Sequence, residues 1–287
     1  MGGSNDRARR RARERYEKQR QRKLERQHRN RRIAGITLVV LVVAGLVSGG
    51  LVLFTGSNSA SSASAKAKAT ASPSASATAS TVAEPATHCT YTKSGTAART
   101  VSLPSATPDY KATYTATIHT NRGNIVINLL NSKATCSVNS FVHLAEAGFW
   151  NQTQCHRLST SSPLYMLQCG DPYATATTKL TCSSTSKVGT GGPGYEFESE
   201  NLSGATYPAG TLAMANTGTA DSNGSQFFLV YKKTSLAADY TPFGTITSGL
   251  DILQNVAKAG YSCSYADSGG GAPKDKVVID SVTIKKA

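Results

Sequence analysis

A run of 22 uncharged and mostly apolar residues, IAGITLVVLVVAGLVSGGLVLF at 33–54, constrains this chain more than any other feature. A helix of that length spans about 33 Å, and the hydrocarbon core of a bilayer is about 30 Å thick. The run therefore predicts a single transmembrane helix. A cleaved signal peptide is the rival interpretation, because small residues follow at 63–67. Its apolar core is usually only about 7–15 residues long, however.

The segment before this run, residues 1–32, carries 14 Lys/Arg and 4 Asp/Glu, a net charge of +10. The whole chain has a net charge of +14, so the basic character belongs mainly to this tail. Basic flanks stay on the cytoplasmic side, which predicts a cytoplasmic N-terminus and an extracytoplasmic C-terminus. Nucleic-acid binding is the alternative use of such a tail. We expect contact with anionic lipid headgroups instead, and no nucleic acid as a partner.

Residues 55–87 are rich in Ser, Ala and Thr and have almost no large side chains. Such a segment cannot bury enough apolar surface to fold, so we expect a disordered linker. The remaining residues, 88–287, have the length of one domain. We therefore expect a tail, an anchor and a linker ahead of a single extracytoplasmic domain, in a protein of the cell membrane that crosses it once. The sequence carries no signal of oligomeric state.

All six cysteines lie in the predicted outer domain. An even number outside the reducing cytoplasm favours disulfides, and the absence of a C-x-x-C spacing disfavours a zinc site. Sequence alone does not choose among the possible pairings. We favour Cys155 with Cys169, which would flank one hairpin, and Cys182 with Cys263.

The outer domain has mainly strand signals, because short β-branched or aromatic runs alternate with Gly, Pro, Asn and Asp. Two segments predict helices, 138–148 with Ser137 as the N-cap and 250–260. Many short strands and two separate helices predict a mainly β fold, a closed barrel with capping helices. The predicted strands lie at 112–120, 123–130, 163–170, 210–216, 225–232, 242–247 and 276–284.

Several kinds of catalytic machinery are missing from the sequence. There is no G-x-S-x-G motif and no P-loop, and Glu196, Glu198 and Glu200 alternate as on a solvated strand face. We therefore expect neither a metal nor another cofactor. What remains near the strands is a set of neutral donors, one arginine and several apolar side chains. Such a set suits a groove that grips an apolar side chain and hydrogen-bonds a peptide backbone.

Seven short motifs follow one another along the outer domain. They are HR at 156–157, YMLQCGD at 165–171, GTGG at 189–192, EFESEN at 196–201, GTLAMAN at 210–216, NGSQFF at 223–228 and FG at 243–244. In this order they resemble the motifs of the cyclophilin-type peptidyl-prolyl cis-trans isomerases, and the resemblance covers about residues 112–286. Through CTY at 89–91 and QCGDP at 168–172, the chain is also similar to the membrane-anchored, extracytoplasmic cyclophilins of Gram-positive bacteria.

The resemblance implies a closed eight-stranded antiparallel barrel with two capping helices. It also implies isomerisation of X–Pro bonds in exported proteins, without a covalent intermediate. A non-catalytic module of the same fold that binds proline-containing peptides is the alternative function. Arg157 would be the catalytic residue. The residues implied to bind substrate are Tyr165, Met166, Gln168, Gly189, Ala215, Asn216, Gln226, Phe228, Leu236 and Tyr240.

The chain departs from the family pattern at several positions. Compared with that pattern, three residues are added between Arg157 and Tyr165, and about 12 are added between Asp171 and Gly189. Tyr240 stands where a histidine is common. Ser235 stands where many members have the tryptophan that helps to bind cyclosporin. We therefore expect reduced cyclosporin affinity but an intact proline pocket.

The stretch 223–231, NGSQFFLVY, places two phenylalanines side by side. In a strand, neighbouring side chains point to opposite faces. We expect Phe227 and Leu229 to point into the barrel, and Phe228 to form the floor of the proline pocket. Gln226 would then lie on the same face as Phe228.

Overall fold

The computed structural model describes residues 84–183, 185–265 and 269–287. The predicted tail at 1–32, the anchor at 33–54 and all of the linker except 84–87 lie outside these ranges. Within the described ranges, the structure contains no helix with the length and apolar character needed to cross a membrane.

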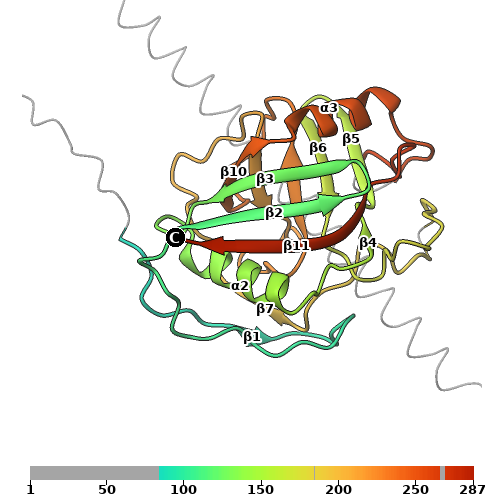
Figure 1. The fold of residues 1–287 in the computed structure, drawn as a ribbon. Coiled ribbons are helices and arrows are strands. Elements are labelled where there is room, and N and C mark those ends of the chain that lie inside the picture. The colour runs from blue at the N-terminus through green and yellow to red at the C-terminus, as the bar shows by residue number, and fades with distance from the viewer. Residues whose placement is uncertain (1–83, 184, 266–268) are drawn as a thin grey trace, which may run out of the picture. The chain divides into compact units, whose positions relative to one another are not determined.

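Nine strands form one curled antiparallel sheet in the order β4-β11-β2-β3-β10-β8-β9-β6-β5. Every pair of neighbouring strands in this sheet is antiparallel. A separate two-stranded sheet joins β1 and β7 (Figure 1). The bounds are β1 Thr92–Lys93, β2 Tyr114–Thr120, β3 Gly123–Leu129, β4 Thr153–Gln154, β5 Arg157–Ser161, β6 Leu164–Cys169, β7 Tyr195–Glu196, β8 Thr211–Met214, β9 Phe227–Val230, β10 Pro242–Ser248 and β11 Val278–Lys286.

The expected closed barrel of eight strands is corrected by this topology. The main sheet has nine strands, and its two end strands are β4 and β5. These strands are consecutive in the chain, with only Cys155 and His156 between them, yet β4 pairs with β11 and β5 pairs with β6. The chain itself therefore passes from one end of the sheet to the other. The sequence analysis did not predict β4 or β5, because neither run shows the β-branched alternation of the other strands.

Two helices accompany the sheet, α2 at Thr135–Glu146 and α3 at Leu250–Ala259 (Figure 1). Both were predicted, each within three residues of its observed start. Phe141 of α2 contacts Trp150 and Phe243, with ring centroids 4.7 and 5.3 Å apart. Leu253 and Val256 of α3 are buried in the same core. The helices and the strands of the main sheet thus share one large core.

The N-terminus of α2 corrects the expectation that Ser137 caps it. The helix begins two residues earlier, and the carboxylate of Glu200 accepts hydrogen bonds from the backbone N–H groups of Cys136 and Ser137 at 2.9 and 2.8 Å. Glu200 also accepts from the Ser137 hydroxyl at 2.7 Å. A carboxylate satisfies the unpaired N–H groups of a helix start and offsets the positive end of its dipole. Glu200 is therefore a capping group rather than a solvated side chain.

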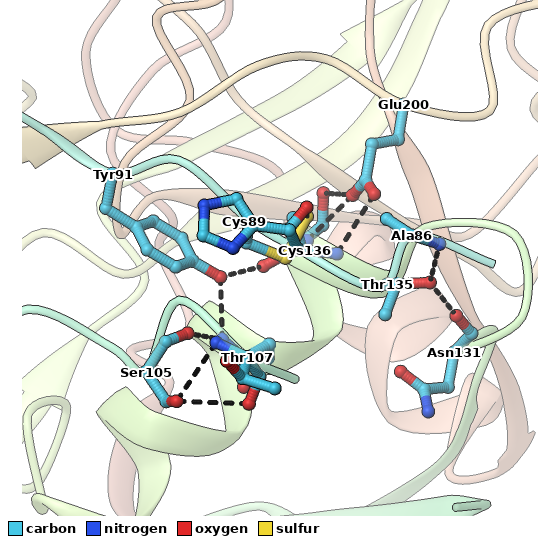
Figure 2. The surroundings of a disulfide bond; sticks show 12 residues. Ala86, Cys89, Tyr91, Ser105, Thr107, Asn131, Thr135, Cys136 and Glu200 are labelled. Carbon is cyan, nitrogen blue, oxygen red and sulfur yellow. Dashed lines mark hydrogen bonds between the residues drawn. A yellow bond between two sulfur atoms is a disulfide. The ribbon is translucent and has the colours of Figure 1, made fainter. Parts of the chain in front are cut away.

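All six cysteines form disulfides. The two pairs favoured from the sequence, Cys155–Cys169 and Cys182–Cys263, are confirmed, and the third joins Cys89 to Cys136. Cys89 belongs to a segment at 84–108 that passes over the start of α2 (Figure 2). In the same segment, the Tyr91 hydroxyl donates to the Cys136 carbonyl at 2.8 Å and accepts from Asn139 at 2.8 Å. The disulfide and these bonds tie the segment to α2.

Removing this tie should lower the stability of the domain. The Cys89–Cys136 bond closes a loop with a sequence separation of 47. A crosslink of that span restricts the unfolded chain, so the Cys89→Ser/Cys136→Ser variant should lose about 2–4 kcal/mol of unfolding free energy. Urea denaturation of the full chain measures this loss, and Ser105→Ala is the control, because it removes an exposed hydroxyl whose hydrogen bonds are to Thr107 of the same segment. An unchanged midpoint for the double variant would show that the segment adds no stability.

Candidate active site

A cavity of about 480 Å³ opens beside β5, β6 and β9. It combines one arginine and several polar groups with an apolar wall. Eleven of its lining residues come from β6, β9 and the loops that follow β6, β8 and β9. It is lined by His156, Arg157, Leu164, Met166, Gln168, Val188, Gly189, Thr190, Ala215, Asn216, Phe228, Leu236, Tyr240 and Tyr265.

The strand register brings the central residues together. Arg157 on β5 is opposite Gln168 on β6, and Gln168 is opposite Phe228 on β9. Residues directly opposite each other on antiparallel strands point to the same face. Three side chains from distant parts of the sequence therefore form one row across the sheet, and all three line the cavity.

The two phenylalanines divide between two cores as predicted. Phe227 and Leu229 belong to the large core, and Phe227 has no solvent-exposed surface. Phe228 belongs to a second, smaller cluster with Met166 and Tyr207, on the cavity side of the sheet. The alternation of β-strand side chains explains this division, because neighbours in one strand point to opposite faces.

The apolar part of the cavity is built around the ring of Phe228. Its centroid lies 5.6 Å from that of Tyr240, at an interplanar angle of 84°. Tyr207 helps to hold Tyr240 in this position, because its hydroxyl donates to the Tyr240 carbonyl at 2.8 Å. Met166 is buried beside Phe228, and Leu236 is half-buried at the edge. The resulting wall suits a compact apolar ring.

Tyr165 corrects one expectation. It does not line the cavity but packs against the large core, with its ring centroid 6.1 Å from that of Tyr231. The Lys232 ammonium lies 4.7 Å from its ring centroid. Because Met166 faces the cavity, its neighbour must face the other way, and Leu164 takes the predicted place of Tyr165 in the wall.

Arg157 is held at two points of its guanidinium group. Its Nη1 donates to Oε1 of Gln168 at 2.9 Å, and its Nε donates to the carbonyl of Gly269 at 2.8 Å. Burial lowers the pKa of Arg157, while the nearby phenol groups of Tyr240 and Tyr265 act in the opposite direction. Arginine nevertheless stays protonated in proteins. The cavity therefore contains a fixed, permanently cationic hydrogen-bond donor.

A relay of hydrogen bonds continues from Gln168 to the loop at 189–191. Nε2 of Gln168 donates to Oε1 of Gln226 at 2.9 Å. Nε2 of Gln226 in turn donates to the carbonyls of Gly189 and Gly191 at 3.1 and 2.9 Å. Gln226 thus lies on the predicted face, next to the cavity rather than in its lining. Its amide positions Gln168, which positions the guanidinium of Arg157.

Asp171 also holds the loop at 189–191 in place. Its buried carboxylate accepts hydrogen bonds from the backbone N–H groups of Tyr173, at 2.8 Å, and Gly189. Burial raises the pKa of Asp171, and these N–H donors act against that rise. Gly189 itself has a φ of +94°, which favours glycine at that turn. A structural role for Asp171 agrees with these contacts.

Ala215 and Asn216 line the side of the cavity next to β8. The side chain of Asn216 is engaged within the protein, because its Nδ2 donates to the Asp239 carbonyl at 2.8 Å and its Oδ1 accepts from the Gly218 N–H at 3.0 Å. Those two bonds fix the loop.

His156 lies directly before Arg157 and is only 2% exposed. Its Nδ1 is buried without a hydrogen-bond partner. Burial, and then the positive charge of Arg157, lowers the pKa of His156 to about 3. The imidazole is therefore neutral at physiological pH, and the cationic group of this cavity is Arg157.

This lowered pKa makes a specific prediction about acid stability. In the unfolded chain the pKa of histidine is about 6.5, so between pH 6.5 and 3 the unfolded state binds the proton and the folded state does not. The contribution of neutral His156 to the free energy of unfolding is fully present above pH 6.5. It should be lower by about 2 kcal/mol at pH 5. Denaturation of the wild type and of His156→Gln at pH 8, 6.5 and 5 measures the effect.

The difference between the two proteins isolates His156 from other groups. Burial raises the pKa values of Asp171 and Glu200, so protonation of these carboxyls adds stability as the pH falls, but it does so in both proteins. The wild type should lose stability relative to His156→Gln on going from pH 8 to pH 5. Parallel pH profiles would show that His156 is not a neutral buried group.

Five lining residues were not among the predicted site residues: His156, Leu164, Val188, Thr190 and Tyr265. Leu164 could have been found, because it is two residues before Met166 in one strand. Val188 and Thr190 flank Gly189, which had been identified. Tyr265 carries no local signal, since its position depends on contacts of its loop with β5. In the described part of the chain, no three His, Cys, Asp or Glu side chains gather to form a metal site.

Comparisons with known proteins point to one family. The sequence pattern of the family described as "Cyclophilin type peptidyl-prolyl cis-trans isomerase/CLD" matches residues 115–284. A "Probable peptidyl-prolyl cis-trans isomerase B" of Mycobacterium leprae is 42% identical over 214 residues, which cover 69% of this chain and 66% of that protein. The protein of the same description from Mycobacterium tuberculosis (strain H37Rv) is 41% identical over 213 residues, which cover 69% of this chain and 64% of that protein.

The match thus spans just under two thirds of the length of these two relatives. Among solved structures, a cyclophilin type peptidyl-prolyl cis-trans isomerase of Cryptosporidium parvum aligns with a TM-score of 0.49 at 24% sequence identity. That alignment covers 60% of this chain and 98% of the other.

Proposed function

The chain belongs to the cyclophilin-type peptidyl-prolyl cis-trans isomerase family, and from this premise we propose that it accelerates the rotation of X–Pro peptide bonds. The observation that carries the proposal is the row of Arg157, Gln168 and Phe228 across three strands. It places a fixed cationic donor next to an apolar wall against which a proline ring can pack. Among the described residues that line the cavity, no nucleophilic side chain is hydrogen-bonded to a basic side chain.

The chemistry needs only such a donor. Amide resonance gives the X–Pro bond a rotational barrier of about 18–20 kcal/mol. As the bond twists, resonance is lost, and the prolyl nitrogen becomes pyramidal with a lone pair that can accept a hydrogen bond. A guanidinium N–H of Arg157 donates to that nitrogen in the twisted state but has no such acceptor in the planar amide. The interaction therefore lowers the barrier rather than merely binding the substrate.

The rest of the cavity would bind the proline ring and the residue before it at two separate places. The proline ring packs against Phe228 and Met166, within the wall that Leu236 and Tyr240 complete. The residue before proline lies along Ala215 and Asn216, where backbone groups hydrogen-bond the peptide. With the ring held by packing, rotation occurs on the acyl side of the bond. Proline-containing polypeptides are thus the proposed substrates.

The cellular setting is also a proposal. The charge and hydropathy of residues 1–54 support an anchor that crosses the membrane once with the N-terminus inside, as in the extracytoplasmic type of Gram-positive bacteria. The three disulfides suit an oxidising compartment. The clients would then be exported proteins. Protease added to intact cells should degrade the C-terminal domain; complete protection would contradict this orientation.

Cyclosporin should bind this protein weakly. Ser235, at the position where many family members have tryptophan, is exposed, and its backbone N–H donates to the Pro163 carbonyl at 2.9 Å. A serine offers little apolar surface to a large apolar ligand. Inhibition at the concentrations that inhibit a tryptophan-containing cyclophilin would contradict this expectation.

The proposed activity is tested by measuring cis-trans exchange of an Ala-Pro peptide with the full chain in detergent. Line-shape analysis by NMR follows exchange directly, without a coupling protease. We expect exchange to accelerate in proportion to protein concentration, with detergent alone as the blank. Exchange at the uncatalysed rate would contradict the proposal. If the peptide binds but its cis-trans exchange stays at the uncatalysed rate, the protein has the alternative function, that of a non-catalytic proline-binding module.

A further inference from the structure

A loop between α3 and β11 contacts three successive residues around Arg157. We call its two described arms, 261–265 and 269–273, the anchoring loop. The Tyr265 hydroxyl donates to the His156 carbonyl at 3.1 Å, and the Gly269 carbonyl accepts from Arg157. Leu158 and Gly271 exchange two backbone hydrogen bonds, both of 2.8 Å. The loop therefore holds the residue before the arginine, its side chain and the residue after it.

Two glycines show how closely this loop lies against β5. A Cβ atom added at Gly270 would collide with the Leu158 carbonyl, and one added at Gly271 would collide with the Cys263 carbonyl. Gly270 also has a φ of +68°, in the left-handed region that favours glycine. The arms are thus fitted against β5 and against each other, with no space for an ordinary side chain at these positions.

The Cys182–Cys263 disulfide links this loop to the stretch that precedes Val188, Gly189 and Thr190. Cys263 lies in the first arm, two residues before Tyr265. Cys182 lies in the stretch that leads to Val188, Gly189 and Thr190, which line the cavity. The disulfide itself does not line the cavity. It joins two segments that do, and that are separated by 81 residues in sequence.

We propose that Tyr265 is a positioning residue for Arg157, acting through the backbone of His156, and that the Cys182–Cys263 disulfide keeps the anchoring loop in place. This inference rests on the proposed isomerase function for its effect on rate. The position of a single guanidinium determines whether its donor reaches the prolyl nitrogen, and small displacements of catalytic groups are costly. The apolar wall at Met166 and Phe228 is built by other strands and does not depend on the loop.

This separation predicts an effect on turnover rather than on binding. Tyr265→Phe keeps the ring and removes the hydrogen bond to His156, so kcat should fall about fivefold, the effect of one neutral hydrogen bond. KM should change less than twofold. Tyr261→Phe is the matched control, because it removes a hydroxyl from the same loop without touching His156, and its kinetics should equal those of the wild type. Wild-type kinetics for Tyr265→Phe would overturn the proposal.

The disulfide is tested in the same way. Cys182→Ser/Cys263→Ser should lower kcat about tenfold at nearly constant KM, as expected for a shifted catalytic group. Cys89→Ser/Cys136→Ser removes a crosslink that joins no segment of the cavity lining, and it should leave kcat unchanged. An equal loss in both double variants would show that general destabilisation, rather than positioning, is the cause.

A second measurement does not depend on activity. The Nε–H signal of Arg157 in ¹⁵N NMR spectra of the full chain, assigned by its loss in Arg157→Lys, reports the bond to Gly269 directly. We expect it to shift and to exchange faster with water in Tyr265→Phe and in Cys182→Ser/Cys263→Ser, but not in Tyr261→Phe. An unchanged signal overturns the positioning role. A changed signal in a protein without isomerase activity would retain the positioning role and reject only the proposed function.

Discussion

Replacement of Arg157 by alanine should lower kcat/KM for prolyl isomerisation by about 10²–10³-fold, the usual effect of removing one preorganised donor from a transition state. The loss should lie mainly in kcat, because the twisted amide and not the planar substrate accepts the hydrogen bond. Arg157→Lys should recover only part of the activity. Lysine keeps the charge but cannot donate to Gln168 and Gly269 in the fixed geometry of a guanidinium.

The control for this prediction is Arg122→Ala. Arg122 is an arginine outside the cavity lining, with its Nη2 3.5 Å from Asp275. An ion pair of this exposed kind contributes little to stability, so the variant should have wild-type kinetics and a nearly unchanged denaturation midpoint. Steady-state kinetics by the NMR exchange assay compare all three variants. Equal rates for Arg157→Ala and the wild type would remove Arg157 from the proposed mechanism.

The second large effect should be on stability and comes from Phe227. This side chain is fully buried, with its ring centroid 5.6 Å from that of Phe141 and 5.5 Å from that of Trp150. Truncation leaves a cavity beside the rings of Phe141 and Trp150, so Phe227→Ala should lose about 3–5 kcal/mol of unfolding free energy. Phe227→Leu fills most of that space and should lose about 1–2 kcal/mol.

The matched variant is one residue away. Phe228→Ala removes the same atoms, but the space opens onto the substrate cavity, where water can enter, so its stability loss should be smaller. Its kcat/KM should fall about tenfold to a hundredfold, because the proline ring loses the surface on which it packs. Urea denaturation and the exchange assay on both proteins give the comparison. Unfolding of Phe228→Ala at lower urea than Phe227→Ala would mean that the two faces have been assigned in reverse.

Strand alternation explains both the successes and one error of the sequence-based predictions. It assigned Phe227 and Phe228 to opposite faces, as the two clusters confirm. Tyr165 and Met166 are also neighbours in one strand, so by the same rule they cannot both line one cavity. The family resemblance nevertheless implied that both bind the substrate. The structure places only Met166 in the lining. Local periodicity was the stronger guide at this position.

Contacts between distant segments explain what the sequence could not show. Ser137 has the residue type of an N-cap, but the carboxylate of Glu200 arrives from another part of the chain and satisfies the same N–H groups. Helix propensity contains no information about such a partner. The number of strands was missed for a similar reason, because β4 and β5 are defined by their pairing with β11 and β6 and not by their composition.

By itself, the sequence determined the properties that depend on neighbouring residues. These are the charge and hydropathy that divide the N-terminal region, the positions of the longer strands and helices, and the face of the sheet on which Phe228 lies. Motifs in a consistent order also identified Arg157 and most of the groups around it. Only the tertiary structure decided how these groups meet. The register across β5, β6 and β9 aligns Arg157 with Gln168 and Phe228, and a disulfide-linked loop brings Tyr265 and Gly269 to the arginine. Such contacts depend on distances between segments far apart in the chain, which no local pattern of residues specifies.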